Sequence, residues 1–483
     1  MLFNSYEFLI FLPIVIIGVA FLPDKYKRLF LLLASYFFYM NWNPVYGLLL
    51  LFCTVITYGT AIFIENSNYK NDNKKTGKKA LILMLIIVFG LLFYYKYFTW
   101  IYVYTGKILT HLNSSLSFTE KNIILPVGIS FFTFQSVAYV IDVYRKDVKA
   151  EKNFIKYALF ISFFPQLVAG PIERSRNLLK QLDGELKVTL KNVKEGIYIL
   201  LWGYFLKIVI ADRAAIYVDT VYTNYADKVS VEIIIATVLF AFQIYGDFGG
   251  YSMIAKGCAK FIGIDLMDNF NSPYTSLSVR EFWRRWHISL NTWFTDYLYI
   301  PLGGSRKGKF RTYVNTLTVF LLSGLWHGAG ITYVLWGLIN GIYILIEKAF
   351  NIKNAGNRII KPVQGIITFI LVDFAWLFFR SQGISNAAGL LKTIISTGSD
   401  KKLGYYLTGN GLDAANMILL LISVLLLIMV DTYTKDGKRV RYLFMNKAFF
   451  IQSFIIILSV TAIMLFGIWG NEYDAANFIY FRF

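Results

Sequence analysis

The stretch from about Val314 to Leu345 is apolar except at its centre, which reads Ser323-Gly324-Leu325-Trp326-His327-Gly328-Ala329-Gly330. The apolar arms on either side are short for a membrane span, which needs about 17–25 residues, and the glycines weaken helical continuity. Irregular backbone at membrane depth persists only where it is buried in protein or lines a water-filled cavity. The stretch 314–346 therefore predicts a broken helix with the titratable His327 at an internal tunnel. The alternative is a histidine that only packs at a helix break.

The composition places this broken helix in a membrane protein. Hydrophobic residues make up 57% of the 483 residues, and charged residues only 16%. Hydropathy indicates about 10–12 transmembrane or re-entrant helices, in segments near residues 6–22, 29–41, 45–64, 80–104, 123–141, 154–170, 193–211, 231–250, 314–346, 362–379, 415–431 and 449–470. We therefore expect an all-α, polytopic integral membrane protein. Residues 1–483 are expected to form a single membrane domain around a central tunnel, with interfacial amphipathic helices.

The basic residues orient the chain. They cluster at residues 25–28, 70–79 and 306–311, and the formal net charge is +19. Short loops rich in Lys and Arg stay in the cytoplasm, so placing residues 25–28 inside puts the N-terminus outside. The charge then reports topology and contact with anionic membrane lipid, and it does not indicate nucleic-acid binding. The segment Met1–Leu22 lacks a basic start and a clear cleavage site, so it predicts a retained first span.

The longest interruption of the hydrophobic pattern, residues 264–311, predicts an interfacial, basic segment. Ser278 and Glu281 have the spacing of a helix-capping box. Apolar residues then recur at helical spacing and form one stripe, which comprises Trp283, Trp286, Leu290, Trp293 and Tyr297. In such a helix Arg280, Arg284 and Asn291 share the face of His287. Between residues 280 and 311 there are seven basic and two acidic residues, a balance that would attract a polyanionic ligand. The alternative is a helix anchored to anionic lipid headgroups.

Three motifs in this region match a known family: Asn269-Phe270-Asn271-Ser272-Pro273-Tyr274, Glu281-Phe282-Trp283-Arg284-Arg285-Trp286-His287-Ile288-Ser289-Leu290 and Asp296-Tyr297-Leu298-Tyr299-Ile300-Pro301-Leu302-Gly303-Gly304-Ser305. They resemble the membrane-bound O-acyltransferase (MBOAT) family. The similarity is to its bacterial branch, the membrane subunits of alginate and peptidoglycan O-acetyltransferases. Further matches extend to the last residues, so the resemblance covers nearly the whole chain.

The resemblance implies acyl transfer from a thioester to a hydroxyl, with His327 as the family's catalytic histidine and His287 as its second signature position. A histidine with a pKa near 6.5 can take the hydroxyl proton during attack. The oxyanion then needs a hydrogen-bond donor, and His287, Asn291 and the amide of Gly328 are all candidates. The basic residues could hold the phosphates of acetyl-CoA, and the expected binding residues are Arg280, Arg284, Arg285, Asn291, Arg306 and Lys307. The three histidines of the chain lack metal-ligand spacing, so no metal site is expected.

The leading hypothesis is an O-acetyltransferase of the bacterial cytoplasmic membrane. It would pass an acetyl group from cytoplasmic acetyl-CoA, a substrate rather than a permanently bound cofactor, toward an extracytoplasmic polysaccharide. The resemblance suggests a partner protein like a Ser/His esterase, which would place the acetyl group on the glycan. One alternative is D-alanyl transfer to teichoic acid from a carrier-protein thioester. Another is a non-enzymatic transporter of a lipid-linked sugar.

Overall fold

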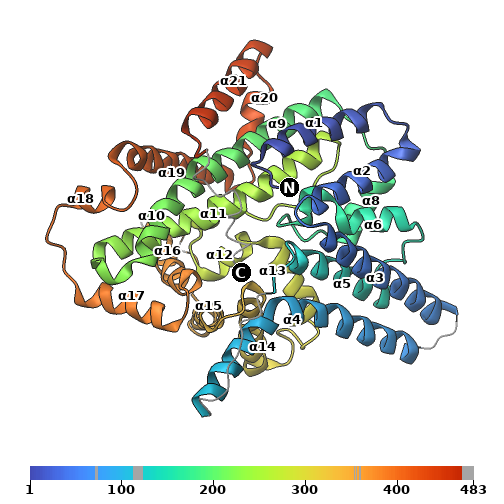
Figure 1. Ribbon diagram of the computed structural model, residues 1–483, viewed down its shortest axis with the longest axis horizontal. Coiled ribbons are helices and arrows are strands. Elements are labelled where there is room, and N and C mark those ends of the chain that lie inside the picture. The colour runs from blue at the N-terminus through green and yellow to red at the C-terminus, as the bar shows by residue number, and fades with distance from the viewer. Residues whose placement is uncertain (71–73, 113–122, 353, 355, 358–359, 470–483) are drawn as a thin grey trace. The chain divides into compact units, whose positions relative to one another are not determined.

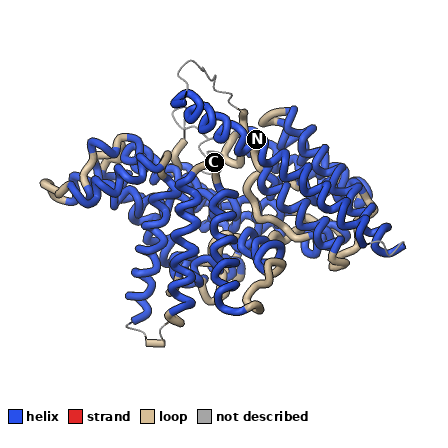
Figure 2. The backbone as a smooth tube through the Cα atoms, turned by 90° about the horizontal axis from the view of Figure 1, so that it is seen from below, coloured by secondary structure: helices blue, strands red, loops and turns tan. Residues whose placement is uncertain are grey.

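The computed structural model describes residues 1–70, 74–112, 123–352, 354, 356–357 and 360–469. Every regular element in these ranges is a helix, as Figure 2 shows. Several helices begin at a side chain that accepts a hydrogen bond from a backbone amide of the first turn. Asn153, for example, accepts from the amide of Lys156 at 3.1 Å, and Asp413 accepts from that of Asn416 at 2.7 Å. Such N-caps satisfy amides that the helix itself leaves without an acceptor.

The chain forms two compact units. Unit 1 comprises Met1–Val193 and Cys258–Met267, and unit 2 comprises Lys194–Gly257 and Asp268–Phe483. The expectation of one membrane domain over residues 1–483 is not tested by this division and stays a prediction. The helices of unit 1 are α1 (Tyr6–Phe21), α2 (Asp24–Met40), α3 (Pro44–Lys70), α4 (Lys74–Leu112), α5 (Ile129–Tyr144), α6 (Phe154–Ser162), α7 (Phe164–Leu167) and α8 (Ser175–Asp183) (Figure 1).

Unit 2 holds most of two helices that cross the boundary in sequence, α9 (Leu190–Tyr204) and α11 (Ser230–Phe261). Its other elements are η1 (Phe205–Ala211, a π-helix), α10 (Asp212–Thr223), η2 (Tyr225–Asp227), η3 (Pro273–Thr275), α12 (Val279–Arg285), α13 (Ile288–Phe294), η4 (Thr295–Tyr299, a π-helix), α14 (Gly308–His327), α15 (Ile331–Ala349), α16 (Ile360–Arg380), α17 (Ile384–Ser396), α18 (Leu403–Thr408), α19 (Ala414–Thr434), α20 (Val440–Met445) and α21 (Phe449–Phe466).

Seven helices of the described ranges are long and apolar enough to cross a membrane: Pro44–Ser67, Lys75–Gly106, Ser230–Phe261, Ile331–Ala349, Ile360–Arg380, Ala414–Thr434 and Phe449–Phe466. Two shorter apolar helices, α1 and α5, accompany them. The prediction of an all-α, polytopic membrane protein is confirmed. The larger count of about 10–12 in the sequence analysis included short and broken segments, which do not meet the length of a full span on their own.

Part of the basic cluster at residues 25–28 has a structural task within unit 1. The Lys27 ammonium donates to the carbonyl of Leu186 at 2.8 Å, and Arg28 Nε donates to that of Leu182 at 2.6 Å. Leu182 lies in the last turn of α8, where helix carbonyls lack amide partners and the helix dipole favours a cation. Arg28 therefore ties α2 to the last turn of α8, and Lys27 ties α2 to the chain just after α8, in addition to the topological role expected from their charge.

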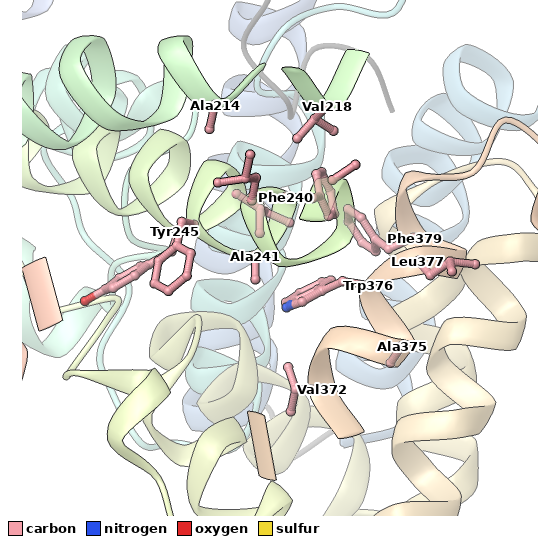
Figure 3. Packing of buried hydrophobic residues seen from close by; sticks show 14 of the residues in the cluster. Ala214, Val218, Phe240, Ala241, Tyr245, Val372, Ala375, Trp376, Leu377 and Phe379 are labelled. Carbon is pink, nitrogen blue, oxygen red and sulfur yellow. The ribbon is translucent and has the colours of Figure 1, made fainter. Parts of the chain in front are cut away.

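The core of unit 2 positions the functional site. Apolar side chains from three helices converge there in Figure 3, namely Ala214 and Val218 of α10, Phe240, Ala241 and Tyr245 of α11, and Val372, Ala375, Trp376, Leu377 and Phe379 of α16. The α14–α15 pair packs beside them at very short range. A Cβ on Gly324 would lie 2.3 Å from the carbonyl oxygen of Tyr333, and one on Gly337 would lie 2.3 Å from that of Phe320. Glycines at these positions therefore allow the two helix backbones to touch.

Candidate active site

His327 is the last residue of α14, and α15 begins at Ile331, so the predicted break of the 314–346 stretch is confirmed. One glycine of the break, Gly328, is required for space. Gly328 has extended backbone at φ −164°, and a Cβ on it would lie 2.2 Å from the Tyr333 ring. The short connection fixes His327 at the junction of the two helices.

One hydrogen bond sets the tautomer of His327. Its side chain is buried at 4% exposure, and Nδ1 lies 2.7 Å from the carbonyl oxygen of Ser323, one turn earlier in α14. A carbonyl oxygen only accepts hydrogen bonds, so Nδ1 of the neutral ring carries the proton. The basic lone pair is then on Nε2, which is the state a general base needs.

Aromatic rings from three helices enclose the His327 imidazole. Its ring centroid lies 4.9 Å from those of Trp326 and Trp336 and 5.5 Å from that of Phe379. All three contacts are edge-on, and Trp336 in turn stacks on Trp376 at 5.7 Å. An apolar wall of this kind excludes water and holds the ring in one orientation.

The structure brings His287, the second predicted histidine, to the same place. The two imidazole centroids are 6.5 Å apart, and Trp326 lies 5.8 Å from His287. Phe248 of α11 contacts the other side of His287 at 4.6 Å. His287 is 1% exposed. Burial lowers the pKa of His287 well below its usual value, with a smaller contribution from nearby His327, so the ring is neutral at physiological pH.

His287 occupies a break in what the sequence presents as one helix. Its backbone is left-handed, with φ 44° and ψ 54°. For a residue other than glycine this conformation costs about 1–3 kcal/mol and is found most often at functional sites. The periodic stripe from Trp283 to Tyr297 predicted a continuous helix, but the structure has α12, a turn at Trp286 and His287, and then α13. The spacing of apolar residues cannot reveal a single left-handed residue, because the helical periodicity continues after it.

The predicted N-cap of this region is confirmed, while the aromatic stripe is more deeply placed than an interfacial helix requires. Ser278 accepts a hydrogen bond from the amide of Glu281 at 3.2 Å. Trp283, Trp286 and Trp293 are each at most 7% exposed. Trp283 Nε1 donates to Asn340 Oδ1 of α15 at 3.1 Å, so the stripe packs into unit 2.

Three of the predicted ligand-binding residues have protein partners. The Arg280 guanidinium lies 3.9 Å from Glu347 and donates to the carbonyl of Ile352 at 3.1 Å. Arg285 pairs with Glu281 at 2.7 Å. Asn291 Nδ2 donates to the carbonyls of Trp283 and Trp286, at 2.5 and 2.6 Å. Asn291 therefore caps the end of α12, and its amide nitrogen is directed at the backbone.

The other three predicted ligand-binding residues present their charge outward. Arg284, Arg306 and Lys307 are exposed. Their side chains form no ion pair and donate no hydrogen bond to any residue that the structure describes. These are the cations that a ligand could reach without breaking an existing contact.

Sequence reasoning missed several residues around the two histidines. Phe248 lies in the apolar helix α11, and nothing in that segment marks its ring as a neighbour of His287. Phe379 carries no local signal, because it reaches His327 only through the packing of α16. In the described ranges, no group of three or more His, Cys, Asp and Glu residues is placed to hold a metal ion.

Comparison with known proteins shows the family of this chain. Residues 149–352 match the family model described as MBOAT, membrane-bound O-acyltransferase family. A probable alginate O-acetylase of Pseudomonas aeruginosa is 38% identical over 401 residues, which cover 83% of this chain and 76% of that protein. The chain belongs to the membrane-bound O-acyltransferase family.

Two further relatives of this MBOAT chain carry different names. A peptidoglycan O-acetyltransferase of Helicobacter pylori is 35% identical over 431 residues, covering 82% of this chain and 80% of the relative. A teichoic acid D-alanyltransferase of Bacillus subtilis is 28% identical over 283 residues, covering 54% and 70%. Family membership makes the chain an acyltransferase, and both histidines lie within the residues that match the family model.

Proposed function

We propose that this MBOAT protein passes an acetyl group from cytoplasmic acetyl-CoA across a bacterial cytoplasmic membrane for O-acetylation of an extracytoplasmic polysaccharide. The observation that carries the proposal is the orientation of His327. Its Nδ1–H is held by the Ser323 carbonyl at 2.7 Å, so the basic Nε2 belongs to a buried ring 6.5 Å from a second imidazole.

In the proposed reaction, His327 Nε2 removes the proton of an acceptor hydroxyl as its oxygen attacks the thioester carbon. A new carbon–oxygen bond forms, and the carbonyl oxygen becomes an oxyanion that neutral His287 can stabilise through a ring N–H. The intermediate then collapses with cleavage of the carbon–sulfur bond. The leaving thiolate takes the proton from His327, which restores the base. General base assistance of this kind contributes about 10²–10⁴-fold to the rate.

The proposed donor site uses the exposed cations. Arg284, Arg306 and Lys307 are accessible to the phosphates of acetyl-CoA, and arginine suits bidentate phosphate contact. Arg280, Arg285 and Asn291 support the same site indirectly, since their polar groups already hold α12 and its surroundings. The positive-inside rule places the basic loop at 306–311 on the cytoplasmic side and the N-terminus outside.

The proposed acceptor side involves a partner protein. Relatives are named for O-acetylation of alginate and of peptidoglycan, which supports a polysaccharide as the final acceptor here. We propose that an extracytoplasmic protein resembling a Ser/His esterase receives the acetyl group and delivers it to the glycan.

A second candidate function is D-alanyl transfer from a carrier-protein thioester. The similarity to the Bacillus subtilis teichoic acid D-alanyltransferase favours it, although that similarity covers 54% of this chain, against 83% for the alginate O-acetylase. The transporter alternative does not account for a general-base tautomer at His327.

Donor specificity tests the proposal. Purified protein in nanodiscs would receive radiolabelled acetyl-CoA in one reaction and a carrier protein charged with labelled D-alanine in another. Binding of coenzyme A would be followed separately by calorimetry. We expect coenzyme A to bind and acetyl-CoA to be consumed. Consumption of the carrier thioester alone would support the second candidate, and movement of a lipid-linked sugar without consumption of either thioester would support a transporter.

A further inference from the structure

The left-handed turn at His287 is held from outside by a neighbouring segment, residues 269–271. The carbonyl of Asn269 accepts a hydrogen bond from the amide of Ile288 at 2.9 Å. Two residues later, the amide of Asn271 donates to the carbonyl of Arg285 at 2.9 Å. The segment therefore pairs with the chain immediately before and immediately after the His287 turn.

The Asn269 side chain adds three contacts that fix this arrangement. Its Oδ1 accepts from the Ser289 hydroxyl at 2.6 Å and lies 3.4 Å from the Ser289 amide, which donates to it. Its Nδ2 donates to the Ser252 hydroxyl of α11 at 3.1 Å. All three side chains are at most 6% exposed. In such surroundings a lost hydrogen bond is not replaced by water, so the network holds its geometry firmly.

The contact with Ser252 connects the turn to a wall of the site. Ser252 lies one helical turn after Phe248, on the same side of α11. The Phe248 ring is the one that contacts His287 at 4.6 Å. Asn269 thus links the backbone that follows His287 to α11, whose Phe248 ring packs against the His287 imidazole. Its hydrogen bonds fix the distance between that backbone and α11.

We infer that Asn269 is a positioning residue for acyl transfer, which places the His287 imidazole beside His327 by holding the left-handed turn. The inference rests on the proposed roles of the two histidines. Asn269 itself acts only through the turn, since its amide nitrogen is bonded to Ser252 and its amide oxygen to Ser289. Displacement of a catalytic group by about 1 Å can lower a rate about 100-fold.

Two substitutions separate positioning from general stability. Asn269→Leu removes every side-chain hydrogen bond of the network. Asn269→Asp keeps an oxygen for Ser289 and offers a second oxygen to the Ser252 hydroxyl, which can donate as well as accept. A matched control is Asn410→Leu, because Asn410 is also fully buried and donates to Glu232 at 2.8 Å, but it contacts neither histidine.

The experiment measures kcat, donor KM and melting temperature for these variants in nanodiscs, using whichever thioester the wild type consumes. We expect Asn269→Leu to lower kcat about 10- to 100-fold with little change in donor KM, and Asn269→Asp to recover most of it. Asn410→Leu should lose stability but keep kcat. The inference is overturned if Asn269→Leu retains kcat within twofold of Asn410→Leu, or if it changes only KM. Failure of the proposed function would appear separately, as an active His327→Ala variant.

Discussion

Replacing the buried Lys207 should lower the free energy of unfolding of unit 2 more than replacing an exposed lysine does. Lys207 lies in the π-helix η1, and its ammonium is 2.8 Å from Asp212 Oδ1 and 2.6 Å from Asp247 Oδ1. The side chains are 7% exposed for the lysine and 4% for each acid. Lys207→Met has nearly the same length, so it removes the charge with little loss of packing. Two buried carboxylates would then face each other without the cation that bridges them.

The expected loss follows from the cost of an uncompensated buried charge. Breaking a buried ion pair by removing one partner costs about 3–5 kcal/mol. At an unfolding entropy of about 2.1 cal/mol/K per residue, this corresponds to a fall in melting temperature of about 3–5 °C for a chain of 483 residues. Asp247→Asn should cost only about 1 kcal/mol, because an amide oxygen still accepts from Lys207 and the Lys207–Asp212 pair remains.

Thermal unfolding in one detergent, followed by tryptophan fluorescence, compares these variants. A triple variant, Lys207→Met with Asp212→Asn and Asp247→Asn, should regain most of the stability, since no buried charge is left. A melting temperature of Lys207→Met equal to that of the wild type, or equal losses for Lys207→Met and Asp247→Asn, would refute this reasoning about the three buried charges.

Three further predictions concern the site. Arg284→Glu should weaken coenzyme A binding about tenfold, which is the value of one charged hydrogen bond. Arg285→Gln should weaken it less, because Arg285 already pairs with Glu281. Calorimetry at two salt concentrations measures both affinities, and equal losses would contradict the placing of the donor phosphates at Arg284. Gly328→Ala should lower the melting temperature and the activity together, because its Cβ would lie 2.2 Å from the Tyr333 ring. A fully active, equally stable variant would contradict this and show that the Tyr333 ring moves aside at little cost. The free energy of unfolding should fall as the pH drops below about 6.5, by up to about 1.4 kcal/mol per pH unit, since unfolded His287 then binds a proton that the folded protein, with its lowered pKa, excludes. Denaturant titrations at pH 7 and 5.5 should show this change in the wild type and a smaller one in His287→Gln.

The sequence predicted the all-helical membrane fold and the break at His327 because both depend on local properties. Apolar length and glycine spacing are readable along the chain, and α14 and α15 meet where the glycines stand. The broken apolar stretch singled out His327, and the likeness to the MBOAT family added His287 as its second signature position; the catalytic roles of both stay predictions. The structure adds that their rings lie 6.5 Å apart.

Long-range packing could not be read in the same way. Phe248 and Phe379 reach the histidines from α11 and α16, and neither residue stands out in its own segment. The basic residues show the same limit. Arg284 and Arg285 are adjacent in sequence and identical in chemistry, yet one is exposed and the other pairs with Glu281. The packing around α12 therefore decides which of the two guanidinium groups stays accessible to a ligand.

Single-turnover acetyl transfer by His327→Ala, beside the wild type, tests the central claim most directly. Both proteins would be prepared in nanodiscs, matched in melting temperature and in affinity for coenzyme A, and mixed with radiolabelled acetyl-CoA in the presence of the acceptor system. The account predicts that the variant binds donor normally and transfers acetyl at least about 100 times more slowly, the loss of a general base. Transfer at the wild-type rate by a folded, donor-binding His327→Ala protein would contradict it.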